Sequence, residues 1–272
     1  MKSSGIFTLR KIIILLLFLQ NGAIAQFAKP DTIPFRIESG LMIVNTTING
    51  FNECQMLFDT GSSTIIKTQD ANRLKIRSKG AVDSFSLGKT QFYNVPILKE
   101  KFNESKKVKT FFSNKNGVLG SNLISLHNWI IDFKLSQLVI DPNVEIDSSW
   151  KEIDFTIDSF GRIWVEPVIT TAKLFAMVDT GAAGGILLLS SFVETYQIPV
   201  SSKKMISFHD LNGKHKCTEY TSEALNFKLG NLQLNDIEIK FSCIHSVLGL
   251  DFLSEYLVYF DFVSRKIYLK EN

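Results

Sequence analysis

One short sequence occurs twice in this 272-residue chain, and the residues around it repeat as well. Residues 58–63 read FDTGSS, and residues 178–183 read VDTGAA. Phe35 and Phe155 each stand 24 residues before the Asp of their own copy. A single Asp-Thr-Gly is usually an ordinary turn, because Asp caps nearby backbone groups and Gly tolerates a sharp bend. Two copies in matched surroundings indicate a duplicated fold in which the turns occupy equivalent places.

The match continues after each turn. Val118-Leu119-Gly120 corresponds to Val247-Leu248-Gly249, and an Asp, Asp132 or Asp261, follows 12 residues after each glycine. A further apolar strand is expected shortly after each of these Asp residues. The two halves therefore share both the turns and the segments that follow them.

Composition favours an all-β fold for both halves. The chain contains 22 Phe, and 45% of its residues are hydrophobic. Aromatic and β-branched side chains pack well on a pleated sheet, and the apolar segments are short and separated by Gly, Asn and Asp. A polar linker at 141–151 divides the chain. We therefore expect one lobe over residues 26–150 and a second over residues 151–272.

The N-terminus has the features of a cleaved export signal. Three basic side chains precede or flank an unbroken apolar run at 12–19, and Ala23-Ile24-Ala25 supplies the small residues that signal peptidase needs. An uncleaved anchor is the alternative, but crossing a bilayer takes about 20 apolar residues. The sequence predicts a signal peptide over residues 1–25 and a secreted or periplasmic protein without stable membrane insertion.

Loss of that segment changes the charge balance. The chain has 30 Lys and Arg against 27 Asp and Glu, and residues 1–25 hold three of the basic residues and no acidic one. The remainder has no net charge, so it lacks the field that attracts nucleic acid or an anionic membrane. Neither is expected as a partner, and the basic segment 99–109 is interpreted as a solvated loop.

Three cysteines leave two alternatives open. Cys54, Cys217 and Cys243 show neither C-x-x-C spacing nor paired His residues, so no metal site is predicted. Export permits a disulfide between Cys217 and Cys243, with Cys54 left as a buried thiol. Three reduced cysteines in the core fit the sequence equally well.

The repeated turns suggest a chemistry for the pair Asp59 and Asp179. A two-fold arrangement of the halves brings the two carboxyl groups together, where they cannot both ionise easily and therefore share one proton. The ionised carboxylate can take a proton from water, while the protonated carboxyl group donates to a carbonyl oxygen. Amide hydrolysis of this kind needs no covalent intermediate, metal or cofactor.

The sequence resembles the aspartic peptidases of the pepsin and retropepsin type, in particular their two-lobed bacterial relatives. The resemblance rests on the two Asp-Thr-Gly turns and the two apolar-apolar-Gly segments, and it extends from about Phe35 to Leu269. It implies the acid-protease fold, with two pseudo-symmetric six-stranded-type β lobes and a cleft between them. It also implies an endopeptidase in which Asp59 and Asp179 are catalytic, a monomer completes the site, no cofactor is used, and the partner is a peptide or protein substrate.

The same resemblance assigns supporting roles within each turn. The hydroxyls of Thr60 and Thr180 are expected to cross-link the two turns. A glycine follows each Thr, because the backbone bends there in a way that a Cβ would obstruct. The other supporting residues are Gly61, Ser62, Gly181 and Ala182.

The residue after each turn predicts where the shared proton resides. In this family a hydroxyl at that position hydrogen-bonds the neighbouring carboxylate and favours its charged form. Ser62 has such a hydroxyl and Ala182 does not. We therefore expect Asp59 to be the more readily ionised carboxyl group and Asp179 to keep the proton.

The flap that this family closes over its substrate is expected on the second lobe. Pepsin-like enzymes carry it on the first lobe, but Asp59 to Gly88 spans only 29 residues here, whereas Asp179 to Gly230 spans 51. The extra length contains strand-forming residues around Asn212-Gly213, a strong signal for a tight hairpin turn. The candidate flap residues are His209, Asp210, Leu211, Asn212 and Gly213.

Other residues with reactive or aromatic side chains have simpler interpretations. Asp132, Asp251 and Asp261 are expected to be structural, and Trp129 and Trp164 to lie in the core. The chain contains no G-x-S-x-G, H-E-x-x-H or G-x-x-x-x-G-K-[ST] motif. One alternative of another class remains, a protein of the same fold without turnover that serves as an exported peptide-binding or scaffold module.

Overall fold

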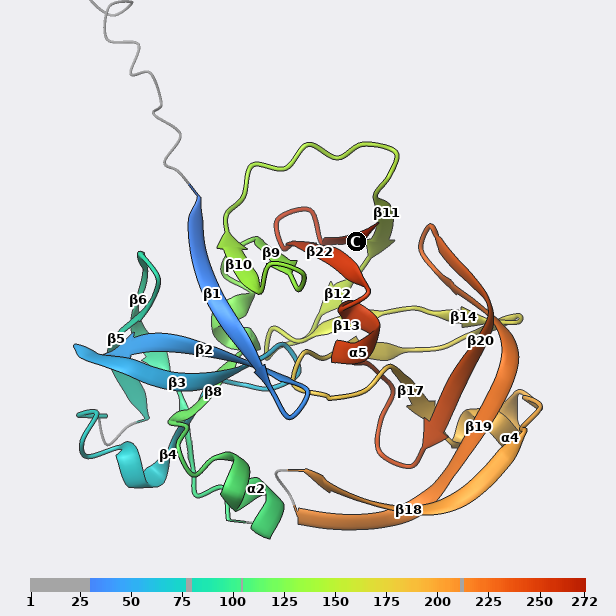
Figure 1. The fold of residues 1–272 in the computed structure, drawn as a ribbon, viewed down its shortest axis with the longest axis horizontal. Coiled ribbons are helices and arrows are strands. Elements are labelled where there is room, and N and C mark those ends of the chain that lie inside the picture. The colour runs from blue at the N-terminus through green and yellow to red at the C-terminus, as the bar shows by residue number, and fades with distance from the viewer. Residues whose placement is uncertain (1–29, 77–79, 104, 211–212) are drawn as a thin grey trace, which may run out of the picture.

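The structure is a computed structural model that describes residues 30–76, 80–103, 105–210 and 213–272 (Figure 1). The predicted signal peptide, residues 1–25, lies outside the described residues. Among the helices in the described ranges, each is too short or too polar to cross a bilayer.

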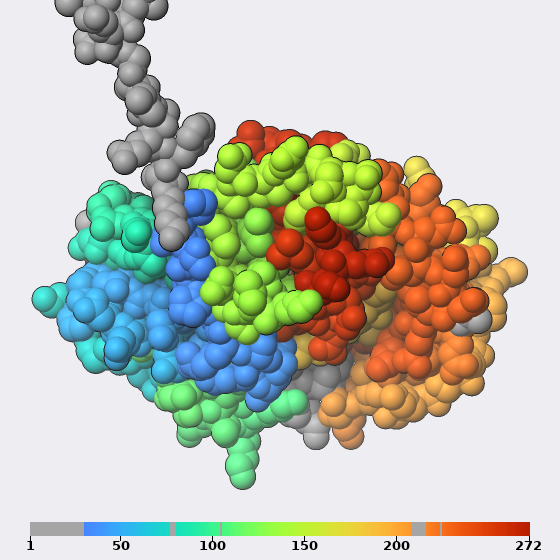
Figure 2. All heavy atoms as spheres, turned by 45° about the horizontal axis from the view of Figure 1, so that its top comes forward, coloured from blue at the N-terminus to red at the C-terminus, as the bar shows by residue number. Residues whose placement is uncertain are grey.

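Both halves of the chain contribute strands to one antiparallel sheet that joins them. Its order is β11–β23–β22–β9–β10–β1, so three strands come from each half. In Figure 2 the segments around β9–β10 and β22–β23 lie between the two lobes. The strands are β1 (Asp31–Glu38), β9 (Trp129–Asp132), β10 (Gln137–Ile140), β11 (Lys151–Asp154), β22 (Tyr256–Asp261) and β23 (Lys266–Glu271).

The pairing of this joining sheet shows the duplication in three dimensions. Asp31 pairs with Ile140 at one edge, and their repeat counterparts Lys151 and Leu269 pair in the same way at the other edge. At the centre, Ile130 of β9 lies opposite its own counterpart, Tyr259 of β22. A residue that faces its own counterpart marks the position of the pseudo-two-fold axis.

Each half adds a lobe of further strands to the joining sheet. In the first half these strands are β2 (Leu41–Ile48), β3 (Phe51–Asp59), β4 (Ile65–Lys67), β5 (Ala81–Leu87), β6 (Thr90–Pro96), β7 (Leu98–Glu100) and β8 (Gly117–Gly120). In the second half they are β12 (Thr156–Ile157), β13 (Ile163–Val165), β14 (Val168–Ile169), β15 (Ala172–Lys173), β16 (Ala176–Val178), β17 (Ile186–Leu189), β18 (Ser202–Asp210), β19 (Gly213–Leu229), β20 (Leu232–Ser242) and β21 (Val247–Leu248). Short helices complete the described residues: η1 (Thr68–Asp70), α2 (Lys106–Phe111), α3 (Ser121–Ile124), α4 (Ser191–Thr195) and α5 (Leu250–Leu253).

One buried apolar cluster runs through both lobes and holds them together. It includes Phe58 and Leu119 from the first half and Val178 and Leu248 from the second, all at most 1% exposed. Trp129 is buried as predicted, and its ring meets that of Phe58 edge-on at 5.4 Å, a contact of about 1 kcal/mol beyond its buried area. The lobes therefore share a core.

The prediction that Trp164 is a core residue is wrong. This residue is only half-buried, and its indole Nε1–H donates to Oδ2 of Asp158 (3.2 Å). The hydrogen-bond partner of the indole nitrogen lies in the surface loop between β12 and β13. This hydrogen bond holds the indole ring at the edge of the lobe.

The long hairpin of the second lobe is formed by β18 and β19. Its last pair is Asp210 with Gly213, so Gly213, which was predicted to lie in the turn, is the first residue of β19. Residues 211 and 212 lie outside the described residues. The hairpin reaches across to the first lobe, where β18 contacts α2 (Figure 1).

An apolar strand passes directly behind each Asp-Thr-Gly turn. β8 runs parallel to β3 and antiparallel to β4, and β21 takes the same place between β16 and β17. A Cβ on Gly120, at the end of β8, would stand 2.2 Å from the carbonyl carbon of Ser63 and 2.4 Å from the carbonyl oxygen of Ser62. Glycine is therefore required for this approach of two backbones.

Gly120→Ala should destabilise the fold by about 3 kcal/mol, because the added methyl group overlaps backbone atoms that cannot rotate away. Gly184→Ala is the matched control, since a Cβ there meets nothing within 4 Å. Urea unfolding monitored by tryptophan fluorescence measures both. Equal midpoints for the two variants would contradict the close packing at Gly120.

Candidate active site

The two Asp-Thr-Gly turns meet at the seam between the lobes, where their threonines cross-link them. The backbone N–H of Thr60 donates to Oγ1 of Thr180 (3.1 Å), and the N–H of Thr180 donates to Oγ1 of Thr60 (3.0 Å). The Thr60 hydroxyl also donates to the carbonyl oxygen of Val178 (2.7 Å). The Thr180 hydroxyl donates to the carbonyl oxygen of Phe58 (2.9 Å). Both threonines are fully buried, so the four bonds fix the turns relative to each other.

The carboxyl groups of Asp59 and Asp179 hydrogen-bond to each other across this seam. Each also accepts a 2.8 Å hydrogen bond from the backbone N–H of the glycine in its own turn, Gly61 or Gly181. A Cβ on Gly61 would stand 2.5 Å from Cγ of Asp179, and one on Gly181 would stand 2.3 Å from Cγ of Asp59. Each glycine thus leaves room for the carboxyl group of the opposite turn. The two Asp residues are 8% and 9% exposed.

Burial raises the pKa of both carboxyl groups above the ordinary value of 3.8. For Asp59, the charge of Asp179 and the hydrogen bond between them add to the effect of burial, so its pKa lies well above that value. For Asp179, the N–H of Gly181 and the hydrogen bond from Asp59 offset part of the effect of burial. The two groups therefore titrate as a coupled pair, and the larger rise in pKa falls on Asp59.

The hydrogen bond that was expected from the Ser62 hydroxyl to Asp59 does not form. The Ser62 hydroxyl donates instead to the carbonyl oxygen of Ser63 (3.2 Å). The hydroxyl therefore does not favour the charged form of Asp59 as expected. The turn also directs that side chain away from the carboxylate it was expected to contact.

His245 is a residue of this site that the sequence analysis missed. It lies exposed just before β21, and its positive charge lowers the pKa of Asp179. The first half has Asn116 at the matching position, so the duplication gives the two carboxyl groups different electrostatic surroundings. The only signal for His245 in the sequence is its place two residues before Val247-Leu248-Gly249.

The remaining predicted residues lie away from the carboxyl pair. Oδ1 of Asp132 accepts from the N–H of Leu135 (2.9 Å), and Oδ1 of Asp261 accepts from the N–H groups of Val263 and Ser264 (both 3.0 Å). Both therefore close turns of the joining sheet. Asp251 is exposed on α5. Of the candidate flap, Asp210 and Gly213 form the last hairpin pair and His209 pairs with Lys214, while Leu211 and Asn212 lie outside the described residues.

The structure brings Cys217 and Cys243 together at the base of the long hairpin. Each thiol affects the pKa of the other, and Sγ of Cys217 lies 3.7 Å from the hydroxyl oxygen of Ser242. All three cysteines are free thiols, with Cys54 buried. Of the two alternatives open from the sequence, the structure shows the reduced form, although only Cys54 is a core residue. In the described part of the chain, no three His, Cys, Asp or Glu side chains gather as a metal site would require.

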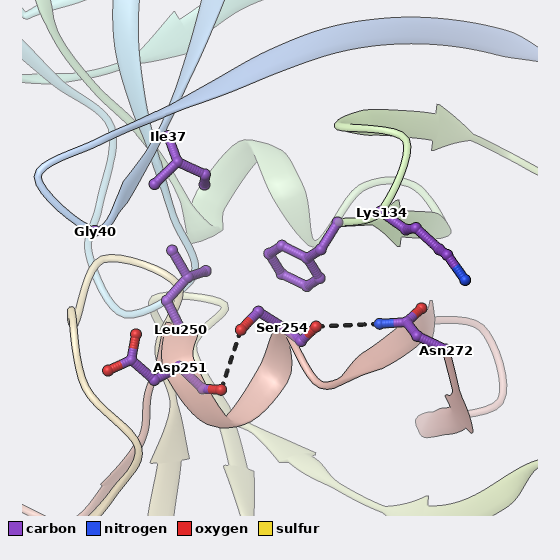
Figure 3. A pocket seen from close by; sticks show the side chains of 8 residues that line it. Ile37, Gly40, Lys134, Leu250, Asp251, Ser254 and Asn272 are labelled. Carbon is purple, nitrogen blue, oxygen red and sulfur yellow. Dashed lines mark hydrogen bonds between the residues drawn. The ribbon is translucent and has the colours of Figure 1, made fainter.

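Two cavities lie near the seam. One, of about 230 Å³, is bordered by the residues that follow Asp59, namely Gly61, Ser62 and Ser63, and by Leu98, Phe160 and Arg162. The other, of about 440 Å³, lies between α5 and the turns after β1 and β9. Figure 3 shows it lined by Leu250, Asp251 and Ser254, with Asn272 donating to the Ser254 carbonyl oxygen. The carboxyl groups of Asp59 and Asp179 line neither cavity, but the smaller cavity adjoins the Asp59 turn directly.

Two pseudo-symmetric β lobes on a shared sheet, with an Asp-Thr-Gly turn from each at the seam, define the acid-protease fold. The predicted all-β acid-protease fold is confirmed by a solved structure, the aspartic proteinase from Irpex lacteus. This chain is 12% identical to it, with a TM-score of 0.54 over 90% of this chain and 98% of that one. At this identity the likeness establishes the fold. No family model matches the chain, and no curated protein does.

Thr60→Val should destabilise the protein by about 3 kcal/mol. The substitution leaves the buried N–H of Thr180 and the carbonyl oxygen of Val178 without their partner, and an unsatisfied buried polar group costs about 1–3 kcal/mol. Thr60→Ser keeps the hydroxyl and should cost less than half as much. Urea unfolding of both variants measures the difference, and equal losses would contradict the larger contribution expected of the hydroxyl.

Asp59→Asn should stabilise the protein relative to the wild type at pH 7 and lose that advantage near pH 4. Because the pKa of Asp59 is raised on folding, the folded chain retains a proton that the unfolded chain releases above its ordinary pKa. The contribution of this group to stability is therefore greatest below about pH 4 and decreases as pH rises toward the folded pKa. Unfolding free energies at both pH values test this.

Asp251→Asn is the control for this measurement, because Asp251 is an exposed carboxylate whose repeat counterpart is already Asn122. A stability gap between Asp59→Asn and wild type that stays constant with pH would contradict the raised pKa.

Proposed function

We propose that this protein is an exported aspartic endopeptidase that hydrolyses peptide bonds with the dyad Asp59 and Asp179. One observation carries the proposal: two buried carboxyl groups, one from each lobe, hydrogen-bond to each other at the seam. Holding two acids in this contact raises their pKa values and costs stability. Such an arrangement is common where a carboxyl pair performs acid–base chemistry.

The larger rise in pKa at Asp59 supports placing the shared proton there, and this placement gives each carboxyl group a role. Asp179, the ionised member, accepts a proton from a water molecule placed between the two groups. Asp59, the protonated member, donates its proton to the carbonyl oxygen of the scissile peptide as the water oxygen attacks the carbonyl carbon. When the tetrahedral intermediate breaks down, the proton on Asp179 passes to the leaving amine and Asp59 recovers its own from the hydroxyl. Both groups then return to their starting states.

The cross-linked threonines act on this chemistry by holding the turns. Their four hydrogen bonds connect backbone atoms immediately before and after each Asp. Two carboxyl groups that repel each other when ionised would otherwise move apart. Thr60 and Thr180 are therefore positioning residues that keep the acids in contact.

Several finer assignments belong to the same proposal. We propose that the hairpin of β18 and β19 acts as the flap, supported by its reach from the second lobe to α2 in the first. We also propose export through the signal peptide 1–25, a secreted or periplasmic location and activity as a monomer. A relationship to the two-lobed bacterial retropepsin-like enzymes is proposed on the sequence motifs alone. The rival function, a peptide-binding module without turnover, has the unusual position of the hairpin in its favour.

Cleavage of casein between pH 3 and 7 separates the two functions. The wild type should release peptides with a bell-shaped dependence on pH, because activity needs Asp179 ionised and Asp59 protonated. Rates fall on the acidic side as Asp179 gains a proton and on the alkaline side as Asp59 loses one. Asp59→Asn and Asp179→Asn should each reduce kcat by at least about a thousandfold, and pepstatin-type inhibitors should block the wild type.

Asp251→Asn serves as the control and should retain wild-type rates. Binding of casein peptides without cleavage at any pH would favour the rival module. Residual activity that survives both dyad substitutions would place the chemistry elsewhere.

A further inference from the structure

The smaller cavity beside the Asp59 turn is built by both lobes. The first lobe provides Gly61, Ser62 and Ser63, which continue directly from the catalytic carboxyl group, together with Leu98 of β7. The second lobe provides Phe160 and Arg162 from the loop between β12 and β13. This cavity of about 230 Å³ adjoins the turn that carries Asp59.

The Ser121 side chain fixes this loop against the catalytic turn. Its hydroxyl lies 2.9 Å from the carbonyl oxygen of Ser62 and 2.8 Å from that of Phe160, so one donor is shared between the two lobes. A Cβ on Gly161 would stand 2.8 Å from Oγ of Ser125 and 2.9 Å from the carbonyl oxygen of Ser121. The loop that carries Arg162 is therefore packed tightly against α3.

Asp158 orients the guanidinium group of Arg162. Its Oδ2 accepts from Nε of Arg162 (2.6 Å) and from Nε1 of Trp164 (3.2 Å). Its Oδ1 accepts from the backbone N–H groups of Phe160 (2.9 Å) and Arg162 (3.1 Å). Four donors surround this carboxylate, which satisfies its usual capacity.

The terminal amino groups of Arg162 remain available to a ligand. Asp158 engages only Nε, and among the described residues no protein acceptor meets the other two nitrogens. The Phe160 ring lies 5.2 Å from the guanidinium carbon and covers one side of it. An oriented guanidinium fork with two unengaged amino groups is the donor set that binds a carboxylate in a bidentate manner.

The duplication does not reproduce this arrangement in the first half. Arg36, before the corresponding turn, donates from Nε to Glu38 (2.5 Å) and from Nη2 to Gln55 (2.7 Å). The guanidinium group of Arg36 is therefore hydrogen-bonded to side chains of its own lobe. The larger cavity near the seam is bordered by Asp251 and Lys134 instead. The two cavities thus differ in charge.

We infer that Arg162 selects substrates that present a carboxylate to the cavity beside the Asp59 turn. Leu98 and Phe160, which are 54% and 57% exposed, provide an apolar surface for the methylene groups that carry the carboxylate. A glutamate side chain and a free peptide C-terminus share this chemistry. The inference rests on the proposed peptidase function, because it assigns the specificity of that site.

A set of matched peptides tests this selection. The host is an amidated peptide that the wild type cleaves, with glutamine at the three positions on each side of the scissile bond. Each variant replaces one glutamine by glutamate, and a further pair ends at each position with a free or an amidated C-terminus. At one position the carboxylate should raise kcat/KM about tenfold over its neutral match, as expected for a charge-assisted hydrogen bond at a partly exposed site. The arm that shows the rise identifies the source of the carboxylate.

Substitutions of Arg162 connect the preference to this residue. Arg162→Gln should bring the ratio of rates for the charged and neutral peptides to about one. Arg162→Lys keeps the charge but loses the fork, so it should leave an intermediate ratio. Lys134→Gln removes one positive charge at the other cavity and should leave the ratio unchanged. A wild-type ratio near one at every position, or a preference that survives Arg162→Gln, would overturn the inference.

A binding measurement tests the carboxylate preference even if the proposed peptidase activity is absent. If the wild type cleaves no peptide, fluorescence polarisation with labelled members of the same set and the Asp59→Asn variant decides the question. About tenfold tighter binding of one carboxylate peptide, lost in the Asp59→Asn, Arg162→Gln double variant, would support the selection without turnover. Equal binding of all peptides would refute it.

Discussion

The contact between two buried carboxyl groups is the constraint on which the rest of this molecule depends. Asp59 and Asp179 are held in mutual hydrogen bonding although burial and charge both oppose it. Several features of the fold serve to maintain that contact. Two glycines leave room for the opposite side chains, two threonines tie the turns, and an apolar strand supports each turn from behind. The stability of the shared core offsets the cost of the acid pair.

The sequence predicted the features that the duplication itself determines. Both Asp-Thr-Gly turns, the strands behind them and the all-β class follow from residue spacing, because spacing fixes how many residues separate two points of the fold. The threonine cross-link was expected from the resemblance, and the hydrogen bonds of Thr60 and Thr180 occur at the expected atoms.

The features that the sequence could not predict depend on side-chain direction. The Ser62 hydroxyl was expected to stabilise the ionised form of Asp59, but its rotamer directs it to the carbonyl oxygen of Ser63. His245 affects Asp179 through space, at a position that no motif marks. Arg162 lies in a loop of the second half yet borders the turn of the first, a proximity that only the pseudo-two-fold packing creates. Local patterns carry no information on such contacts between lobes.

The joining sheet gives the chain a particular order of completion. Strand β9 pairs on one side with β10, but its other edge is covered only by β22 of the second half. If the first half folds before the second, the first lobe therefore presents an unpaired strand edge at β9 until residues 256–261 pair with it. Open edges of this kind pair readily with other chains. The pseudo-two-fold axis makes the fold comparable to a dimer in which the C-terminal lobe takes the place of the second subunit. The first lobe must therefore avoid aggregation until β22 has paired with β9.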